Sequence, residues 1–301
     1  GQTINCIGQQ IGKPCTKNIK CEIENRSHNC RKYGQCKIAV RQHFVDLNAS
    51  AMFLAFLRLF HTRITDIFDE VIPHIRKGSI PGLHRMAELL EMLGNPHREL
   101  KYVHIAGTNG KGSTAAMSAS ILNAAGYRAG MFTSPYIYRF HERIQLCGEQ
   151  IADEDLVEVV NYVYPYAERM ADPPTEFELV CAIAFEYYRR KQADIIVLEC
   201  GMGGLLDATN IIPAPEVAVI TNIGDAHIEN LGSRENIFKA KCELLPHVKG
   251  DGLLVLNGDD DFLPSLKGKT EPDAVFCGGG EGLDYTARVT GGDGLSFITC
   301  D

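Results

Sequence analysis

The sequence predicts an α/β protein with a doubly wound, mostly parallel sheet that carries a phosphate-binding loop. Three observations support this prediction. Apolar segments with the length of buried strands alternate with segments of helical period over most of the chain. A glycine-rich loop, residues 107–113, follows one such strand and precedes a helix. Apolar residues make up 45% and charged residues 23% of the 301 positions, as in folded globular proteins.

Charge divides the chain into two parts. Residues 1–44 hold eight of the 30 Lys and Arg but two of the 38 Asp and Glu, so the rest carries 22 basic and 36 acidic side chains. We predict a basic, Cys-rich and poorly ordered extension over residues 1–62, followed by an enzyme domain over 63–301. The extension contains no close C-x₂₋₄-C pair, so a zinc site there would need a looser ligand set that includes His28 or His43.

Composition also excludes several classes of partner. The net charge of −8 argues against a general nucleic-acid binder, because phosphate backbones are held by clustered Lys and Arg. The longest mainly apolar stretch, near residues 49–57, is too short to span a membrane, and no signal peptide is visible. Because the chain starts at Gly1 and runs into an apolar strand at Asp301, both ends are expected to be cut. Small molecules are therefore the expected partners.

The elements of the second part can be followed in order. Apolar residues recur at helical spacing over 64–75 and again over 83–93, where Gly94 and Pro96 end the second helix. The apolar run 102–106 is the strand that leads into the glycine-rich loop. The small-residue segment after the loop then predicts a helix, followed by a strand and two more helices, over 113–125, 128–132, 153–170 and 176–192.

The remaining segments extend the sheet. The continuous apolar run 193–200 is typical of a strand buried on both faces of a parallel sheet. Two more strands are predicted at 217–221 and 252–257, with a helix over 235–245 between them. The last thirty residues are glycine-rich and predict a hairpin. Strands that alternate with helices in this way imply right-handed crossovers in a doubly wound sheet.

The glycine-rich loop reads GTNGKGS and predicts a binding site for a nucleoside triphosphate. Glycines allow successive N–H groups to face one anion, the helix start adds its positive dipole end, and Lys111 adds a mobile cation. The common P-loop pattern G-x-x-x-x-G-K-[ST] differs, because Gly112 here separates Lys111 from Ser113. The residues expected at the phosphates are Gly107, Thr108, Asn109, Gly110, Lys111, Gly112 and Ser113.

Two residues beyond strand ends are candidates for a metal site. Glu199 ends the strand run that begins at Asp194, the usual place for an acidic residue that holds nucleotide-bound Mg²⁺. His227 lies six residues after Thr221, where the next strand is predicted to end. Mg²⁺ prefers oxygen ligands, so residue chemistry alone does not predict an imidazole ligand.

These motifs resemble those of the folylpolyglutamate synthases and dihydrofolate synthases, a branch of the Mur ligase superfamily. The resemblance runs from about residue 63 to 301 and comprises GTNGKGS at 107, FTSP at 132, ERI at 142, TEFE at 175, ECGMGGLLDATN at 199 and IGDAH…LG from 223. It implies the fold of the Mur ligase central domain. It also implies a cytoplasmic monomer, in a chain that stops before the carboxyl-terminal domain that binds the incoming glutamate.

The resemblance implies roles for individual residues. Ser134, Glu199 and His227 would bind one or two Mg²⁺ ions, and Lys241, carbamylated, would add a carboxylate-like ligand, with Lys239 as the competing choice. Residues implied to contact substrate or to support these ligands are Pro135, Arg143, Asp207 and Asn210. For Asp207 and Asn210, loop capping is an equally open interpretation. Glu178 of TEFE is open between a functional role and an exposed helical carboxylate.

The implied reaction is ATP-dependent amide ligation. ATP converts the terminal carboxyl group of a folate or dihydropteroate into an acyl phosphate, whose carbonyl the amine of L-glutamate attacks. Two alternatives stay open. The segment 221–241 and the NGDD sequence at Asn257, the counterpart of an adenine-binding motif, also resemble the ligase that extends muramyl peptides in cell-wall synthesis. A chain that stops before the glutamate-binding domain is also compatible with nucleotide binding without catalysis. The sequence argues against a dehydrogenase, because the third glycine of G-x-G-x-x-G is missing at Leu206 and no helix is predicted to open there.

Overall fold

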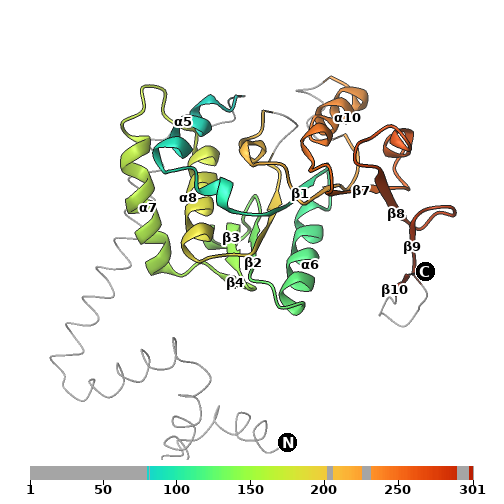
Figure 1. Cartoon of the computed structure of the whole chain (residues 1–301), viewed down its shortest axis with the longest axis horizontal. Helices are drawn as coiled ribbons and strands as arrows, with labels where there is room; N and C mark the ends of the chain where they lie inside the picture. The colour runs from blue at the N-terminus through green and yellow to red at the C-terminus, as the bar shows by residue number, and fades with distance from the viewer. Residues whose placement is uncertain (1–79, 81, 202–205, 226–231, 290–297, 301) are drawn as a thin grey trace, which may run out of the picture. The chain divides into compact units, whose positions relative to one another are not determined.

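The computed structural model describes residues 80, 82–201, 206–225, 232–289 and 298–300 (Figure 1). The extension predicted over 1–62, the helix predicted over 64–75 and His227 lie outside these described residues. No helix within the described ranges is long and apolar enough to cross a membrane.

A ten-stranded sheet forms the centre of the described chain, in the order β10-β9-β8-β7-β6-β1-β5-β2-β3-β4 (Figure 1). The seven strands from β9 to β2 in this order run parallel, and β3, β4 and β10 are antiparallel to their neighbours. The predicted doubly wound, mostly parallel α/β sheet is therefore confirmed. The strands are β1 (Tyr102–Ala106), β2 (Ala129–Phe132), β3 (Ile144–Leu146), β4 (Glu149–Gln150), β5 (Ile195–Glu199), β6 (Val217–Ile220), β7 (Leu253–Asn257), β8 (Ala274–Gly278), β9 (Tyr285–Val289) and β10 (Ile298–Cys300).

Helices cover both faces of the central strands. They are α5 (His84–Met92), α6 (Lys111–Ala124), α7 (Asp153–Ala167), α8 (Glu176–Arg190) and α10 (Arg234–Cys242). On one face, Ile105 of β1 and Val197 of β5 pack with Ala115 of α6. On the other face, Tyr102 of β1 and Leu198 of β5 belong to a larger core with side chains of α5, α7 and α8. All five residues of β1 are buried, as is typical of a parallel strand covered on both sides.

The pairing of β1 with β5 decides which side chains meet each layer. Ile105 lies opposite Glu199 and His104 lies opposite Leu198. Because successive side chains of a strand point to opposite faces, Glu199 shares the α6 face with Ile105. This register therefore places the last carboxylate of β5 on the same side of the sheet as the helix that follows the glycine-rich loop.

The structure differs from the prediction at two hairpins. The β3–β4 hairpin was not predicted, and its turn has positive φ at Cys147 (54°) and at Gly148 (80°). Two-residue hairpin turns need such backbone angles, which Asn and Gly signal in a sequence but Cys does not. The hairpin predicted for the last thirty residues is wrong for β8 and β9, which pair in parallel, whereas β9 and β10 pair antiparallel.

Two buried histidines make the stability of this fold sensitive to acid. His97 and His104 are each 3% exposed, and burial lowers the pKa of each from 6.5 to about 4, with the charge of Arg98 contributing at His97. Between these values the unfolded chain binds protons that the folded chain excludes, so the free energy of unfolding falls as the pH drops from 6.5 to 4. We expect a loss of about 3 kcal/mol per histidine over this range. Urea unfolding at several pH values measures it.

His104→Gln provides the control for this prediction, since glutamine is uncharged at every pH in the range. The variant should show a shallower fall in unfolding free energy between pH 6.5 and 4 than the original chain. Equal slopes for the two proteins would contradict the assignment of the acid sensitivity to His104.

Candidate nucleotide and metal site

The glycine-rich loop connects β1 to α6 at the carboxyl end of the central strands (Figure 1). Strands β5 and β2 lie on one side of β1, and β6 and β7 lie on the other. The strand order therefore reverses at β1, and open α/β sheets bind ligands in the crevice at such a switch point. The loop occupies this position.

The loop turns into the helix earlier than predicted. Gly110 is the N-cap residue of α6 with φ 77°, and the helix begins at Lys111 rather than at Ser113. Glycine is a poor helix former, so the sequence gives no sign that Gly112 belongs to the helix. Since the helix starts two residues earlier, Lys111 and Gly112 belong to its first turn, where N–H groups have no partner within the helix. Their N–H groups can therefore bind an anion.

Gly107 is required by a close approach of the chain after β6. Its φ is 145°, and a Cβ atom built on it would lie 1.8 Å from Oγ1 of Thr221. We expect Gly107→Ala to lower the free energy of unfolding by at least 2 kcal/mol and to abolish nucleotide binding, since a clash is added to backbone strain (a cost of about 2 kcal/mol or more). Chemical unfolding and calorimetric titration with nucleotide measure these effects.

Gly110→Ala is the matched control for backbone strain. Its φ of 77° is also in the left-handed region, but a Cβ atom there meets nothing within 4 Å. The alanine at position 110 should therefore destabilise the fold less than the one at 107. If both variants lost the same stability, the contact with Thr221 would not be the cause.

A carboxylate from β5 faces the loop. Glu199 is 5% exposed, and its Oε2 accepts a hydrogen bond from the backbone N–H of Ser134, at 3.0 Å. A Cβ atom on Gly112 would lie 3.6 Å from the same oxygen. The structure therefore brings together Gly112 of the loop, Glu199 and Ser134, which are three predicted site residues from separate segments.

Burial raises the pKa of Glu199, while the N–H group of Ser134 and the charge of Lys111 oppose that rise. A buried carboxylate beside the glycine-rich loop fits the chemistry of a Mg²⁺ ligand, because a bound cation offsets the desolvation of the carboxylate. Within the ranges that the structure describes, no three His, Cys, Asp or Glu side chains gather into a metal site. A Mg²⁺ ion here would need oxygens from Ser134 or from phosphate in addition to Glu199.

Helix α10 supplies a buried lysine to the same region. Lys241 is 6% exposed, whereas Lys239 is exposed, so of the two candidates Lys241 is the one that points inward. Leu244, just beyond the helix, packs with Ala106 and Cys200 at the ends of β1 and β5. Burial lowers the pKa of Lys241, and the charge of Lys111 lowers it further. A lowered pKa increases the fraction of neutral, nucleophilic amine.

Asp207 combines loop capping with an electrostatic effect on the site. Its Oδ1 accepts hydrogen bonds from the N–H (2.9 Å) and hydroxyl (2.6 Å) of Thr209, and so caps the short helix η4 (Ala208–Ile211). Because the hydroxyl donates to Asp207, Nε2 of His104, 3.0 Å from Thr209 Oγ1, must carry a proton and donate to it. The charge of Asp207 raises the pKa of Lys241 against the effect of burial. The N–H of Asn210 donates to the backbone oxygen of Asp207.

The segment after Ser134 presents aromatic side chains. Its Ser134–Pro135 peptide bond is cis. The guanidinium carbon of Arg143 lies 5.2 Å from the ring centroid of Tyr136, and Arg143 Nε is buried with no hydrogen-bond partner among the described residues. Tyr138, at the exposed tip, is 90% accessible. The predicted contact of Pro135 and Arg143 with substrate remains a prediction.

Asn257 holds strand ends together. Its Nδ2 donates to the carbonyl of Thr221, and its Oδ1 accepts from the N–H of Asp259, both at 2.9 Å. The amide of Asn257 thus joins the ends of β6 and β7. Its predicted contact with adenine remains a prediction.

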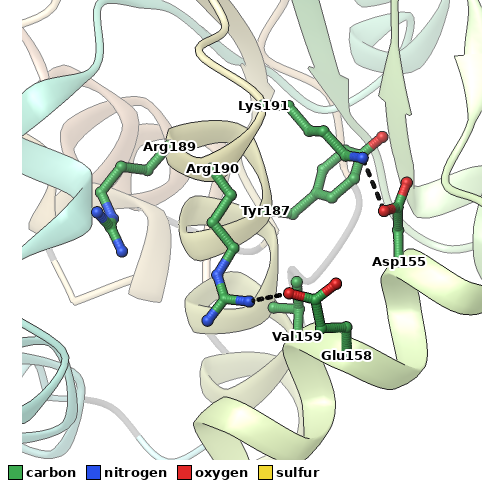
Figure 2. Close-up of a pocket in the computed structure, with 7 residues that line it drawn as sticks. All are labelled: Asp155, Glu158, Val159, Tyr187, Arg189, Arg190 and Lys191. Atoms are coloured by element: carbon green, nitrogen blue, oxygen red, sulfur yellow. Dashed lines mark hydrogen bonds and ion pairs between the residues drawn. The ribbon is translucent and has the colours of Figure 1, made fainter.

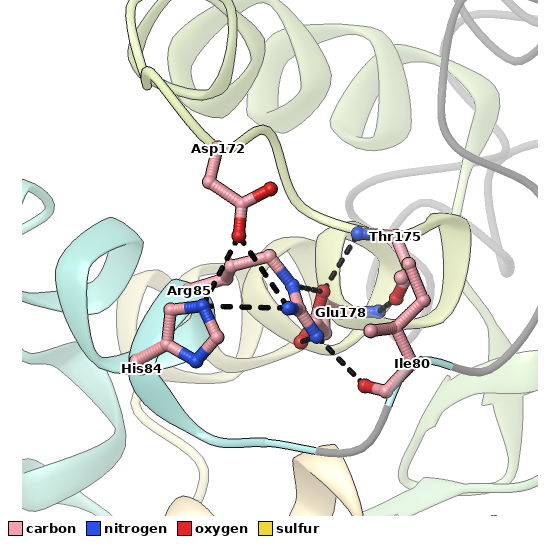
Figure 3. A network of polar contacts seen from close by, with 6 residues as sticks. All are labelled: Ile80, His84, Arg85, Asp172, Thr175 and Glu178. Carbon is pink, nitrogen blue, oxygen red and sulfur yellow. Dashed lines mark hydrogen bonds and ion pairs between the residues drawn. The ribbon is translucent and has the colours of Figure 1, made fainter.

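A buried ion pair between α5 and α8 was not predicted. Arg85 of α5 and Glu178 of α8 are 2% and 3% exposed, and Figure 3 shows the guanidinium and carboxylate facing each other. The interpretation of Glu178 as an exposed carboxylate is therefore wrong. Its position follows from the N-terminal capping box of α8, in which Thr175 and Glu178 hydrogen-bond reciprocally. Phe177, which precedes Glu178, lies against Gly201. A Cβ atom built on Gly201 would be 2.7 Å from Cζ of the Phe177 ring.

A separate surface pocket lies between α7 and α8 (Figure 2). Its cations are all paired: Lys191 with Asp155 at 2.7 Å, Arg190 with Glu158 at 2.8 Å, and Arg189 with the buried Glu186 at 2.8 Å. The pocket lies at the C-terminus of α8, which leads into the start of β5, whereas the glycine-rich loop is at the other end of the strands. It is not part of the candidate site.

Comparison with known proteins gives consistent matches. The Mur ligase middle domain matches residues 105–290. A dihydrofolate synthase/folylpolyglutamate synthase of Bacillus subtilis is 43% identical over 164 residues, which are 53% of this chain and 38% of that protein. A folylpolyglutamate synthase of Lacticaseibacillus casei is 42% identical over 153 residues, 49% of this chain and 36% of that protein. The chain thus spans less than half the length of these curated relatives.

Solved structures of related proteins have a similar fold. A folylpolyglutamate synthase (FPGS) complex with AMPPCP and folate has a TM-score of 0.70 at 31% identity, over 79% of this chain and 58% of that one. A folylpolyglutamate synthase of Thermotoga maritima has a TM-score of 0.65 at 33% identity, over 77% of this chain and 52% of that one.

Proposed function

Because this chain belongs to the Mur ligase family, whose middle domain matches residues 105–290, we propose that it is the ATP-binding part of a ligase that adds L-glutamate to a folate or dihydropteroate. The observation that carries the proposal is the meeting of the glycine-rich loop with Glu199 and Ser134 at the switch point of the sheet. Relatives named dihydrofolate synthase and folylpolyglutamate synthase support the acceptor class. A related FPGS solved with AMPPCP and folate supports both ligands.

A carboxylate is a poor electrophile, so ligation needs activation of the acceptor. In the proposed reaction the γ-phosphoryl group of ATP passes to a carboxylate oxygen of the acceptor, and ADP leaves. The amine nitrogen of glutamate then attacks the carbonyl carbon of this acyl phosphate. Inorganic phosphate departs with the former carboxylate oxygen, and the nitrogen loses a proton to give the amide.

The residues of this chain contribute mainly positioning and charge neutralisation, because phosphoryl transfer to a carboxylate brings anions together. The N–H groups of residues 110–113 and the N-terminus of α6 face the phosphates, and Lys111 neutralises the transferred group. Bound Mg²⁺, one or two ions, supplies further neutralisation. We propose Glu199 and Ser134 as its ligands together with His227, which lies outside the described residues.

Lys241 is proposed to be carbamylated, which would place a carboxylate near the metal. Formation of a carbamate from CO₂ requires a neutral amine, and burial lowers the pKa of Lys241 in that direction. Incubation of the purified protein with ¹³C-labelled bicarbonate should give a carbamate signal in its ¹³C NMR spectrum. The spectrum of Lys241→Met should lack this signal. A spectrum that is the same for both proteins would refute the modification.

The activity test uses the complete reading frame that contains this sequence, because the chain spans less than half of its relatives. ADP formation is measured with MgATP, L-glutamate and either tetrahydrofolate or dihydropteroate, and the product mass identifies the amide. Turnover only with a muramyl tripeptide and D-alanyl-D-alanine would move the protein to the cell-wall branch. Nucleotide binding with no turnover on any acceptor would indicate a non-catalytic nucleotide binder.

The proposal also includes the setting in which the protein acts. We propose a cytoplasmic monomer that works on small molecules and binds no nucleic acid. Size-exclusion chromatography with light scattering tests the oligomeric state, and cell fractionation tests the compartment.

A further inference from the structure

We propose that Asn222 is a positioning residue that holds the first half of the glycine-rich loop in its nucleotide-binding form. The inference rests on nucleotide binding at this loop, which is part of the proposed function. Asn222 follows β6 and Thr221, and no sequence motif singled it out. Its contacts with the loop carry the argument.

The side-chain amide of Asn222 bonds to one dipeptide of the loop with both of its ends. Oδ1 accepts hydrogen bonds from the backbone N–H groups of Thr108 (3.2 Å) and Asn109 (2.9 Å). Nδ2 donates to the backbone carbonyl of Asn109, at 3.2 Å. Because one end must accept and the other must donate, an amide at this position satisfies both requirements, whereas Asp has no donor and Leu has neither a donor nor an acceptor.

Neighbouring residues add to the same clamp. The hydroxyl of Thr221 donates to the Asn109 carbonyl at 2.7 Å, and the N–H of Gly224 donates to Thr108 Oγ1 at 2.9 Å. The backbone carbonyl of Asn222 accepts from the N–H of Thr108 at 3.0 Å. The segment 221–224 therefore fixes Thr108 and Asn109 of the loop through both side chains and backbone.

This clamp divides the loop into two halves with different tasks. The N–H groups of Thr108 and Asn109 are committed to Asn222, so they are not directed at a phosphate. The N–H groups that remain for the nucleotide are those from Gly110 onward, at the start of α6. The geometry of the second half depends on where the first half ends, and a loop that is already ordered loses less entropy when it binds its ligand.

We expect removal of the Asn222 side chain to act on nucleotide binding rather than on the affinity for the acceptor, because the hydrogen bonds of its amide are with the glycine-rich loop.

The test is calorimetric titration of the complete protein with MgADP and with Mg-AMPPCP, for the original protein, Asn222→Ala and Asn123→Ala. Asn123 is the matched control, because its Oδ1 also accepts a backbone N–H, that of Ala129 at 3.1 Å, but at the far end of α6. We expect Asn222→Ala to weaken nucleotide binding by about 10-fold to 100-fold, from the loss of two or three hydrogen bonds that order the loop. Asn123→Ala should bind as the original protein does.

A second readout separates positioning from a general loss of structure. Hydrogen exchange of the ligand-free protein should show faster exchange of the Asn109 amide in Asn222→Ala, with the amides of β1 unchanged. In a ligation assay the KM for ATP should rise, while the KM for the acceptor should stay the same. If Asn222→Ala does not fold, Asn222→Asp replaces it, since aspartate keeps the acceptor oxygens but lacks the donor to Asn109.

The outcomes distinguish this inference from the proposed function. If the original protein binds nucleotide and both Asn222 variants bind it equally well, the positioning role is wrong and the proposed function stands. If the original protein binds no nucleotide, the proposed function fails, and the inference fails with it. Weakened binding in Asn123→Ala to the same extent as in Asn222→Ala would also overturn the inference, because the effect would not be specific to the loop.

Discussion

Replacing Lys111 with alanine should reduce the rate of ligation by about 10³-fold, the largest effect we expect from a single change at the site. Lys111 is the first residue of α6, and its Nζ donates to the Thr108 carbonyl at 3.2 Å. The ammonium group therefore lies over the loop, where the phosphates are proposed to bind. Negative charge develops on the departing oxygen of ADP as the phosphoryl group is transferred, so a lysine at the β- and γ-phosphates acts more strongly in the transition state than in the ground state.

The measurement compares turnover with nucleotide affinity. Turnover should fall by more than affinity does, because the loop N–H groups still hold the ground-state phosphates in Lys111→Ala. Lys101→Ala is the control, since Lys101 is exposed and precedes β1 at the opposite end of the strand. A Lys111→Ala protein with turnover within about threefold of the original would exclude the lysine from phosphoryl transfer.

Arg85→Met should lower the free energy of unfolding by about 3–5 kcal/mol, because it leaves the buried carboxylate of Glu178 without its counter-charge. Arg85 Nε and Nη2 donate to the two oxygens of Glu178 at 3.0 and 2.9 Å, and Nη2 also donates to the carbonyl of Ile80 at 2.7 Å. Glu178 Oε2 further accepts from the N–H of Thr175 at 2.7 Å. Figure 3 shows this network joining α5 to the first turn of α8.

The double variant Arg85→Met/Glu178→Met tests whether the loss comes from an isolated charge. It should be more stable than Arg85→Met alone, because no buried charge remains without a partner. The surface pair of Lys249 and Glu216, 43% and 30% exposed at the side chain, gives the comparison, and Lys249→Met should cost less than about 1 kcal/mol. Equal losses for Arg85→Met and Lys249→Met in urea unfolding would refute the importance of burial.

Local patterns predicted those parts of the site that depend on neighbouring residues in the chain. The strand, loop and helix around Lys111 were predicted because the apolar run, the glycines and the small-residue helix are adjacent in sequence. Glu199 was predicted because a carboxylate at the end of a buried strand lies at the ligand-binding edge of a parallel sheet. The preference for Lys241 over Lys239 came from the family resemblance, and the structure adds the burial that distinguishes them.

Contacts between distant segments could not be predicted in this way. Asn222 and Thr108 are 114 positions apart, and Arg85 and Glu178 are 93 apart, so no local pattern records their pairing. A single polar residue after a strand is also common in loops, which gives Asn222 no distinctive signal. The clamp on the loop and the ion pair between α5 and α8 are therefore properties of the tertiary structure.

The pairing of Ile105 with Glu199 has a consequence for how the chain tolerates change. If β5 slipped by one residue against β1, Glu199 would turn from the α6 layer into the apolar layer that contains Tyr102 and Leu198. A misregistered sheet would thus bury a carboxylate among hydrocarbon side chains, and the same slip would remove that carboxylate from the glycine-rich loop. Selection against that misfolded state and selection for the site therefore act on the same residue. A single-residue insertion or deletion within β5 should be eliminated by both kinds of selection.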